Sequence, residues 1–227
     1  MKQVLLILFI LLSMLSGYAQ SFYFEKPDYK EIEKAIKVKG SDYYYSALME
    51  RYHRADTTMT LEEKRHLYYG YSFQPKYSPY DTPDFADSLR AVLQKDQHSD
   101  SELKRIVKYA DLLLADNPFD LRAINYQLYA LEKLEKQEAF RKRLNQMNIT
   151  IEALLSSGDG LKKESAFYVI YTTHEYDLLD ILGFQFGGQQ SLIEHYDYLK
   201  VAENPSQVEG MYFDVSPCLN SLNKMFK

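Results

Sequence analysis

The sequence has a single cysteine, Cys218, no tryptophan and no run of basic residues. One cysteine excludes an internal disulfide bond and any zinc or redox motif built on paired cysteines. Nucleic-acid binding requires clustered lysine and arginine, so the formal net charge of −5 argues against a nucleic-acid partner. The sequence also has no glycine-rich phosphate-binding loop and no Gly-x-Ser-x-Gly motif, and we expect no cofactor.

The longest apolar run lies at the N-terminus. Lys2 gives this segment a cationic start, residues 4–12 are unbroken apolar sequence, and Gly17 and Ala19 occupy the small-residue positions typical of a signal-peptidase site. The run is too short to span a membrane comfortably, and polar sequence follows it. We therefore expect residues 1–19 to be a signal peptide that is cleaved before Gln20; the alternative is a buried N-terminal helix.

The rest of the chain is expected to be soluble and exported. Cys218 lies far from the cleavage site, so the protein is not expected to be a lipoprotein with an acylated N-terminal cysteine. No later segment is apolar enough to span a membrane. These features predict a periplasmic or extracellular protein.

Helix-start signals are frequent up to residue 160. Thr60 with Glu63 and Ser99 with Glu102 have the spacing of capping boxes, and apolar residues recur at helical spacing over residues 103–114 and 123–134. The segment 156–160, Ser-Ser-Gly-Asp-Gly, then ends the helical pattern. Residues 20–160 are therefore predicted to be an α-helical region.

The sequence changes character after residue 160. The segment 166–173 is β-branched and aromatic, and residues 184–186, 191–193, 195–201 and 211–215 have the composition of short strands. Ser216-Pro217 then predicts the start of a final helix. The predicted fold class is α+β: an N-terminal tetratricopeptide-like helical array, followed over residues 161–227 by a small antiparallel β-sheet and a C-terminal helix packed on it.

The tetratricopeptide-like part rests on residues 83–155. A helix is expected to end near Asn117-Pro118, and Ala123 and Ile124 occupy the places of the small and large apolar residues that open the next helix in that family. Pro83 precedes Pro118 by about one repeat length of roughly 34 residues. The segment therefore resembles a tetratricopeptide junction; the alternative is an ordinary bundle of helical hairpins.

Tyrosine is abundant, with 21 copies, and nine of them lie between Tyr43 and Tyr80. The densest part surrounds Gly70 and supplies the candidate binding residues: His66, Tyr68, Tyr69, Tyr71, Phe73, Tyr77 and Tyr80. Exposed rings with hydroxyl groups would stack on sugars or anchor a protein partner. The alternative is structural: the rings would close the end of the helical array and lie buried.

Several segments resemble one family. They are Tyr43–Tyr52, Asp56-Thr57-Thr58 and Leu67–Tyr71, and in the tail residues 175–179, 190–192 and 212–216. They look like exported proteins of Bacteroides-type bacteria that form a domain of unknown function. This resemblance implies export and a shared fold, and it supplies no catalytic residue. It also implies a candidate modification site at Thr57, since Asp56-Thr57-Thr58 is similar to the short sequon that such bacteria O-glycosylate at the first threonine; the alternative, which we favour, is that these are ordinary solvated turn residues.

The sequence holds two candidates for metal-binding or catalytic chemistry. Glu50 with His53 and Glu63 with His66 form Glu-x-x-His pairs, but they fall on two short predicted helices, and Glu63 is also the capping partner of Thr60. No metal site is therefore expected. Cys218 lies near a helix start but leads an apolar series, so we expect a buried, unreactive thiol.

These observations favour a non-catalytic protein-interaction module with an unknown protein partner, because no complete catalytic set of residues is present. Two alternatives stay open. One is a periplasmic enzyme with a dispersed site that uses His66 or His174 with nearby carboxylates. The other is an accessory protein that binds a glycan on an aromatic platform within residues 68–80.

Overall fold

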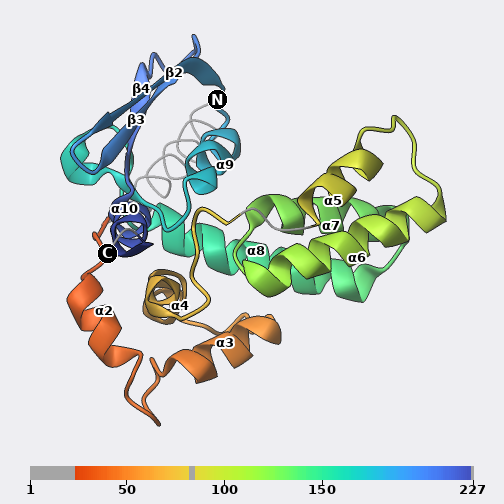
Figure 1. The fold of residues 1–227 in the computed structure, drawn as a ribbon, viewed down its shortest axis with the longest axis horizontal. Coiled ribbons are helices and arrows are strands. Elements are labelled where there is room, and N and C mark those ends of the chain that lie inside the picture. Colours follow the sequence, from red (N-terminus) through yellow and green to blue (C-terminus); the bar gives the residue numbers. More distant parts are fainter. Residues whose placement is uncertain (1–23, 82–84, 226–227) are drawn as a thin grey trace, which may run out of the picture.

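The computed structural model describes residues 24–81 and 85–225 and shows an α+β fold (Figure 1). The predicted signal peptide lies outside these residues. Within the described ranges the chain forms nine α-helices and one four-stranded sheet. No helix in these ranges is both long and apolar enough to cross a membrane.

Of the first three described helices, one precedes the tyrosine-rich stretch Tyr43–Tyr80 and two lie within it. They are α2 (Tyr29–Ala35), α3 (Tyr45–His53) and α4 (Leu61–Gly70), and the 3₁₀ turn η1 (Tyr71–Phe73) continues directly from α4. The capping box at Thr60 is confirmed: the Glu63 backbone N–H donates to Thr60 Oγ1 at 3.2 Å, and the Thr60 N–H donates to Glu63 Oε2 at 2.7 Å. Helix α4 packs against α2, α3 and α8.

Four further helices form a row in which each packs against the next. They are α5 (Ala86–Leu93), α6 (Asp100–Asp116), α7 (Leu121–Lys133) and α8 (Gln137–Leu155) (Figure 1). The predicted capping box at Ser99 and Glu102 starts α6. Helix α8 extends beyond this row to reach α3 and α4, so it connects the two helical parts.

The C-terminal part contains the sheet and two helices. After the 3₁₀ turn η2 (Lys163–Ser165) come β1 (Phe167–Tyr168), α9 (Thr173–Ile181), β2 (Phe186–Ile193), β3 (Tyr196–Val201), β4 (Gly210–Asp214) and α10 (Ser216–Met225). The strand order is β1-β4-β3-β2. The predicted final helix is confirmed as α10.

The expectation of an antiparallel sheet is wrong for one pair of strands. The β2–β3 and β3–β4 pairs are antiparallel, but β1 runs parallel to β4, which makes the sheet mixed. The reason is that α9 follows β1 and carries the chain across before β2 begins, so β1 joins the far side of β4. Of the predicted strand over 166–173, only Phe167–Tyr168 form β1, and the chain turns through residues 169–172 into α9 at Thr173.

Two hydrophobic clusters hold the molecule together. The first, which we call the aromatic core, joins α2, α3, α4, α8, α9, the sheet and α10, and its buried aromatic residues are Tyr45, Tyr52, Tyr68, Tyr69, Tyr71, Phe119, Phe167, Tyr171 and Phe213. The second, the aliphatic core, lies between α5, α6 and α7 and consists of Leu89, Val92, Leu103, Ile106, Ala110, Leu113, Leu114, Ala123, Ile124, Leu128 and Ala130.

Candidate functional site

Three of the candidate binding tyrosines lie in the aromatic core. Tyr68 and Tyr69 have no exposed surface, and Tyr71 is 4% exposed. The hydroxyl of Tyr69 donates to the Ala153 carbonyl at 3.0 Å, and that of Tyr71 donates to the Asp116 carbonyl at 2.8 Å. These rings cannot stack on a ligand from solvent, so of the two interpretations the structural one, in which the rings lie buried, holds for these three residues. Helix α4 carries Tyr68 and Tyr69 inward because it is covered by α2, α3 and α8, and Tyr71 follows at the start of η1.

Tyr68 forms a buried hydrogen-bonded network with His174. The Nε2–H group of His174 donates to the Phe119 carbonyl at 3.0 Å, which leaves Nδ1 to accept from the Tyr68 hydroxyl at 2.6 Å. The backbone N–H of Ile170 donates to the Tyr68 oxygen at 3.2 Å. Burial lowers the pKa of His174 to about 4. At neutral pH this histidine is therefore uncharged, fully buried and engaged at both nitrogens.

His66 is placed differently, on the outer side of α4. Its ring stacks on Tyr43 with centroids 4.0 Å apart, and its Nδ1–H donates to the Glu62 carbonyl at 2.8 Å. The carboxylate of Glu63 instead forms an ion pair with Arg51. The structure therefore does not bring the Glu63 and His66 side chains together as a Glu-x-x-His pair.

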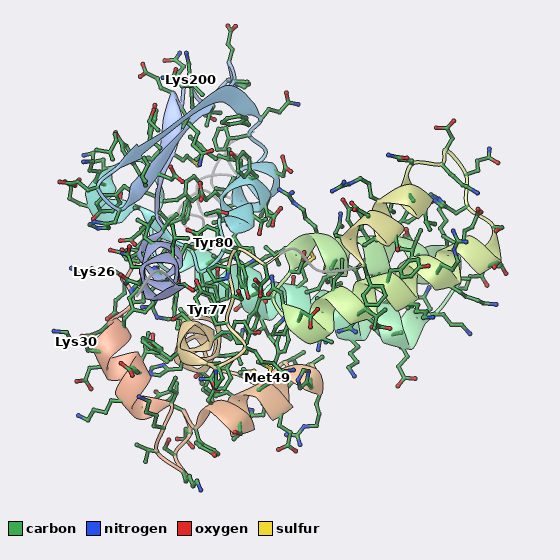
Figure 2. All side chains as sticks on the ribbon, viewed as in Figure 1. Lys26, Lys30, Met49, Tyr77, Tyr80 and Lys200 are labelled. Atoms are coloured by element: carbon green, nitrogen blue, oxygen red, sulfur yellow. The ribbon has the colours of Figure 1, made fainter. Side chains whose placement is uncertain are left out.

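The remaining aromatic candidates lie on the segment that leaves α4. Tyr80 is 41% exposed, whereas Phe73 and Tyr77 are partly buried. Figure 2 shows Tyr77 and Tyr80 on this segment, which runs past α10. Phe73 and Tyr77 line a cleft of about 690 Å³ between α2, η1 and α10.

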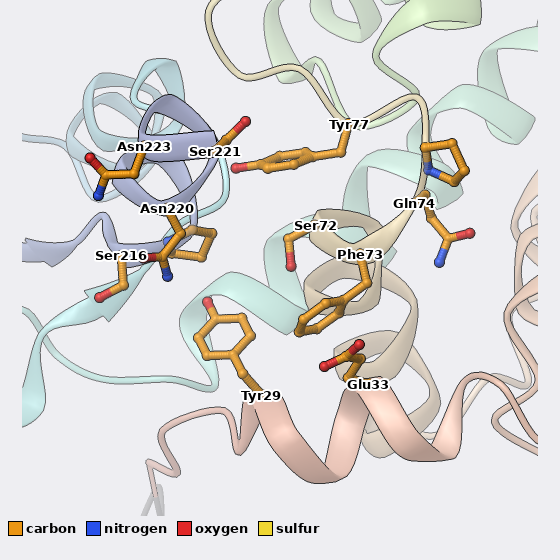
Figure 3. A pocket seen from close by; sticks show the side chains of 12 residues that line it. Tyr29, Glu33, Ser72, Phe73, Gln74, Tyr77, Ser216, Asn220, Ser221 and Asn223 are labelled. Atoms are coloured by element: carbon orange, nitrogen blue, oxygen red, sulfur yellow. The ribbon is translucent and has the colours of Figure 1, made fainter. Parts of the chain in front are cut away.

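The cleft has aromatic and polar walls (Figure 3). Tyr29 from α2 joins Phe73 and Tyr77 as the aromatic lining, and α10 contributes the polar side chains of Ser216, Asn220, Ser221 and Asn223. The sequence of α10 explains this orientation. Cys218 and Leu219 of α10 pack into the aromatic core, whereas Asn220 and Asn223 are exposed on the other side of the helix.

Tyr77 is held rigidly in the cleft wall. Its hydroxyl donates to the Ile170 carbonyl at 2.6 Å, and its ring makes edge contacts with Tyr71 and Tyr171 at centroid distances of 6.0 and 5.6 Å. Burial raises the pKa of Tyr77, so the hydroxyl stays protonated. In Figure 3 its side chain extends across the cleft toward Ser221.

Tyr29 has an unusual environment. Its hydroxyl is buried and has no hydrogen-bond partner among the described residues, although its ring packs edge-on against Tyr69 and Phe73. Figure 3 shows this hydroxyl directed from α2 toward the α10 side of the cleft. A buried hydroxyl without a partner costs about 1–3 kcal/mol, so a polar group placed in the cleft would be favoured here.

Cys218 and Glu175 are two buried ionisable groups near this region. Cys218 is fully buried, as expected, and burial raises the pKa of its thiol to about 12. Glu175 has no exposed surface, and its carboxyl oxygens have no partner among the described residues. Burial, followed by the charge of Asp197, raises the pKa of Glu175 to about 9, so this carboxyl is protonated at pH 7.

Sequence reasoning missed Tyr29, Asn220 and Asn223 as cleft residues and Glu175 as a buried acid. Two signals were present in the sequence. Asn220 and Asn223 lie three residues apart on the polar side of a predicted amphipathic helix. Glu175 precedes Leu178 and Leu179 by three and four positions, which places it on the apolar side of α9. Tyr29 had no comparable signal.

Thr57 lies exposed in the turn between α3 and α4. The preceding Asp56 is fixed, because its carboxylate accepts from Thr58 Oγ1 at 2.7 Å and from Arg51 Nε at 2.7 Å. These hydrogen bonds, of which the one from Thr58 contributes most, hold the pKa of the Asp56 carboxyl well below its usual range. The Thr57 side chain is thus accessible next to an ordered aspartate.

Comparison with known proteins links most of the chain to a family. The family DUF4919, described as a domain of unknown function, matches residues 30–224. Comparisons with curated proteins and with solved structures found no match. The matched range includes η1 and all but one residue each of α2 and α10, which form the cleft, and it begins one residue after Tyr29.

Proposed function

The chain belongs to the DUF4919 family, and we propose that it is an exported, non-catalytic binding protein that holds part of a partner in the cleft between α2, η1 and α10. The observation that carries this proposal is the combination of rigid aromatic rings with amide and hydroxyl side chains in one cleft. Tyrosine, serine and asparagine are also the residues on which antibody binding loops rely. Aromatic rings supply contact area at a low entropic cost, and the short polar side chains supply adaptable hydrogen bonds.

The size of the cleft is consistent with binding. Its volume of about 690 Å³ lies within the usual range of roughly 300–1,000 Å³ for ligand sites. Because Tyr77 is tethered to Ile170, at least one wall is formed before any ligand arrives. A preformed wall reduces the entropic cost of association.

The placement of His66 and His174, the two histidines considered for an enzyme, supports binding rather than catalysis. A general base must reach a substrate proton within hydrogen-bond distance. His174 is buried and already bonded to Tyr68 and Phe119, and His66 is stacked on Tyr43. Neither side chain is among those that line the cleft.

Two further features belong to the same proposal. Consecutive packing of α5 to α8 supports a tetratricopeptide-like array within residues 20–160, with residues 161–227 as a small α+β region packed on it. Export rests on the signal-peptide pattern of residues 1–19.

In-cell photo-crosslinking tests the binding proposal. The full chain would be produced in its own host with a photo-reactive phenylalanine analogue at Ser221, which lines the cleft. A matched variant would carry the analogue at Lys104, which is exposed on α6. We expect a discrete adduct only from position 221. Equal adducts at both positions, or none at 221, would contradict the proposal.

Thr57 is also proposed as a modification site, supported by its exposure next to the ordered Asp56. The expected result is a glycan-sized mass increase in the exported protein that is absent from the Thr57→Ala variant. An unmodified mass for the exported wild-type protein would refute it.

A further inference from the structure

We infer that the cleft between α2, η1 and α10 binds an uncharged saccharide through its ring face and its hydroxyl groups. This inference rests on the proposed binding function and names the chemical class of the ligand. It differs from the flat aromatic platform that the sequence left open, because the rings that line the cleft do not share one plane. Tyr29 and Phe73, for example, are inclined by 66°.

The charge of the cleft disfavours an acidic ligand. Phosphate and carboxylate groups are bound by arginine and lysine side chains, which supply charge-assisted hydrogen bonds. Among the described side chains that line the cleft, Glu33 alone carries a formal charge at pH 7, and that charge is negative. The Glu33 carboxylate is already paired with Lys37 Nζ at 2.6 Å, so neither charge is free, and no described side chain that lines the cleft is a cation that could pair with an anion. The favoured ligand is therefore neutral.

The polar lining matches a ligand with many hydroxyl groups. An asparagine amide offers both donors and acceptors, and so does each serine hydroxyl. The side chains of Asn220, Ser221 and Asn223 form no hydrogen bond with the rest of the described chain, so they are available to a ligand. A sugar hydroxyl is likewise both donor and acceptor, and neighbouring hydroxyls on a ring have the spacing that a planar amide bridges.

The Tyr29 hydroxyl gives an independent indication. It is buried, unpaired within the described chain and directed toward the α10 side of the cleft (Figure 3). Burial raises its pKa well above 10, so it remains a donor. A ligand oxygen in the cleft would remove the cost of leaving this donor unpaired.

The aromatic walls suit the apolar C–H face of a sugar ring. The C–H bonds on one side of a pyranose ring form a small apolar face that packs on an aromatic ring. Tyr77 offers such a ring in a fixed orientation, since its hydroxyl is tied to Ile170 and its edges contact Tyr71 and Tyr171. Phe73 provides a second apolar contact across the cleft.

The test is a titration of the mature chain, residues 20–227, followed by NMR. The probes are neutral hexasaccharides of glucose, mannose and galactose, an oligogalacturonate of equal length, and an uncharged Ser/Asn/Gly peptide. We expect at least one neutral hexasaccharide to bind and to shift the signals of α10, with no binding of the acidic oligosaccharide. Asn223→Ala should weaken binding about tenfold, because it removes hydrogen bonds to the ligand.

Asn148→Ala is the matched control, since Asn148 is exposed on α8 outside the cleft. This variant should bind as the wild type does. Absence of binding by every neutral hexasaccharide, preferential binding of the oligogalacturonate, or equal effects of the two asparagine substitutions would overturn the inference. If the peptide alone bound in the cleft, the saccharide assignment would fail while the binding function stood. Failure of the crosslink at position 221 would instead remove the binding function itself.

Discussion

The aromatic core and the aliphatic core stabilise the same chain in different ways. The aliphatic core contains only Leu, Ile, Val and Ala among its buried members, and its contacts are non-directional. In the aromatic core, tyrosine hydroxyls donate to backbone carbonyls of distant elements, as Tyr52 does to Pro118 at 2.7 Å and Tyr69 to Ala153 at 3.0 Å. Each such bond fixes the position of one element on another. The tyrosine hydroxyls therefore specify how α4 meets α8 and α9 and how α3 meets the turn between α6 and α7, and the cleft lies at the edge of this fixed region.

The largest effect is expected from Phe119→Ala. Phe119 is fully buried, and its ring lies 5.2, 5.6 and 5.4 Å from the rings of Tyr52, Tyr68 and Tyr71. Removing a buried phenylalanine costs about 3–5 kcal/mol, and here the cavity would open among rings whose hydroxyls are tethered. Denaturant unfolding should show this loss, and hydrogen exchange should accelerate in α3, α4 and α9 together.

Ile106→Ala provides the matched change in the aliphatic core, where Ile106 is also fully buried. It should cost about 2–5 kcal/mol and accelerate exchange mainly in α5, α6 and α7. If both substitutions accelerated exchange in the same helices, the two cores would be one cooperative unit and the contrast would be wrong.

Glu175→Gln should stabilise the protein at neutral pH. The folded-state pKa of Glu175 is raised from 4.5 to about 9, so the folded protein keeps a proton that the unfolded chain releases between these values. Stability is therefore full below pH 4.5 and decreases as the pH rises toward 9. The amide variant lacks this loss, and its advantage at pH 7 should be on the order of 3 kcal/mol.

Thermal unfolding at pH 4 and pH 7 separates this effect from ordinary repacking. The gain should be present at pH 7 and absent at pH 4. Glu132→Gln is the control, because Glu132 is exposed on α7 beside the aliphatic core. A gain of the same size at both pH values would show that the pKa of Glu175 is not raised in the folded protein.

Tyr68→Phe should cost about 1–3 kcal/mol, since it removes one hydroxyl that bonds His174 and accepts from the Ile170 N–H. His174 Nδ1 and the Ile170 N–H would then stay buried without a hydrogen bond, while His174 Nε2–H would keep its bond to the Phe119 carbonyl. Tyr126→Phe is the comparison in the other region, because the Tyr126 ring packs against the aliphatic core and its hydroxyl bonds to no described residue. The denaturant midpoint should fall further for Tyr68→Phe than for Tyr126→Phe. Equal midpoints would show that the bonded hydroxyl of Tyr68 contributes no more to stability than the unbonded hydroxyl of Tyr126.

Local features could be predicted from the sequence, and long-range ones could not. Thr60 with Glu63 and Ser99 with Glu102 were recognisable because a capping box involves four consecutive positions. The parallel pairing of β1 with β4 depends on where α9 leads the chain, which no local pattern records. Likewise, the spacing of the tyrosines could not show which rings α8 would cover.

The candidate site was only half predictable for the same reason. Phe73 and Tyr77 belong to a conspicuous segment, but the opposite wall comes from the other end of the chain. Asn220 and Asn223 look like ordinary solvent-facing residues until α10 is placed beside α2. The burial of Glu175 could have been predicted from the sequence, because its carboxylate occupies an apolar position of a helix.

The smallest expected effects concern the two capping boxes, one in each region. Thr60→Ala should cost about 1 kcal/mol, because the Glu63 N–H loses its side-chain acceptor. Ser99→Ala should cost less, since the corresponding bond from the Glu102 N–H is 3.4 Å long and lies at the surface. Hydrogen exchange of these two N–H groups is the measurement.

The two helix starts also differ in what remains after substitution. Glu63 is 11% exposed in its side chain and stays paired with Arg51, which is itself tied to Asp56. Glu102 is held by Lys95, whose side chain is 55% exposed, and an exposed pair is weakened by salt. In 0.5 M NaCl, Ser99→Ala should therefore increase fraying of α6 while Thr60→Ala leaves α4 ordered. Equal fraying of both helices would show that the aromatic core does not fix its helix ends more firmly than the aliphatic core does.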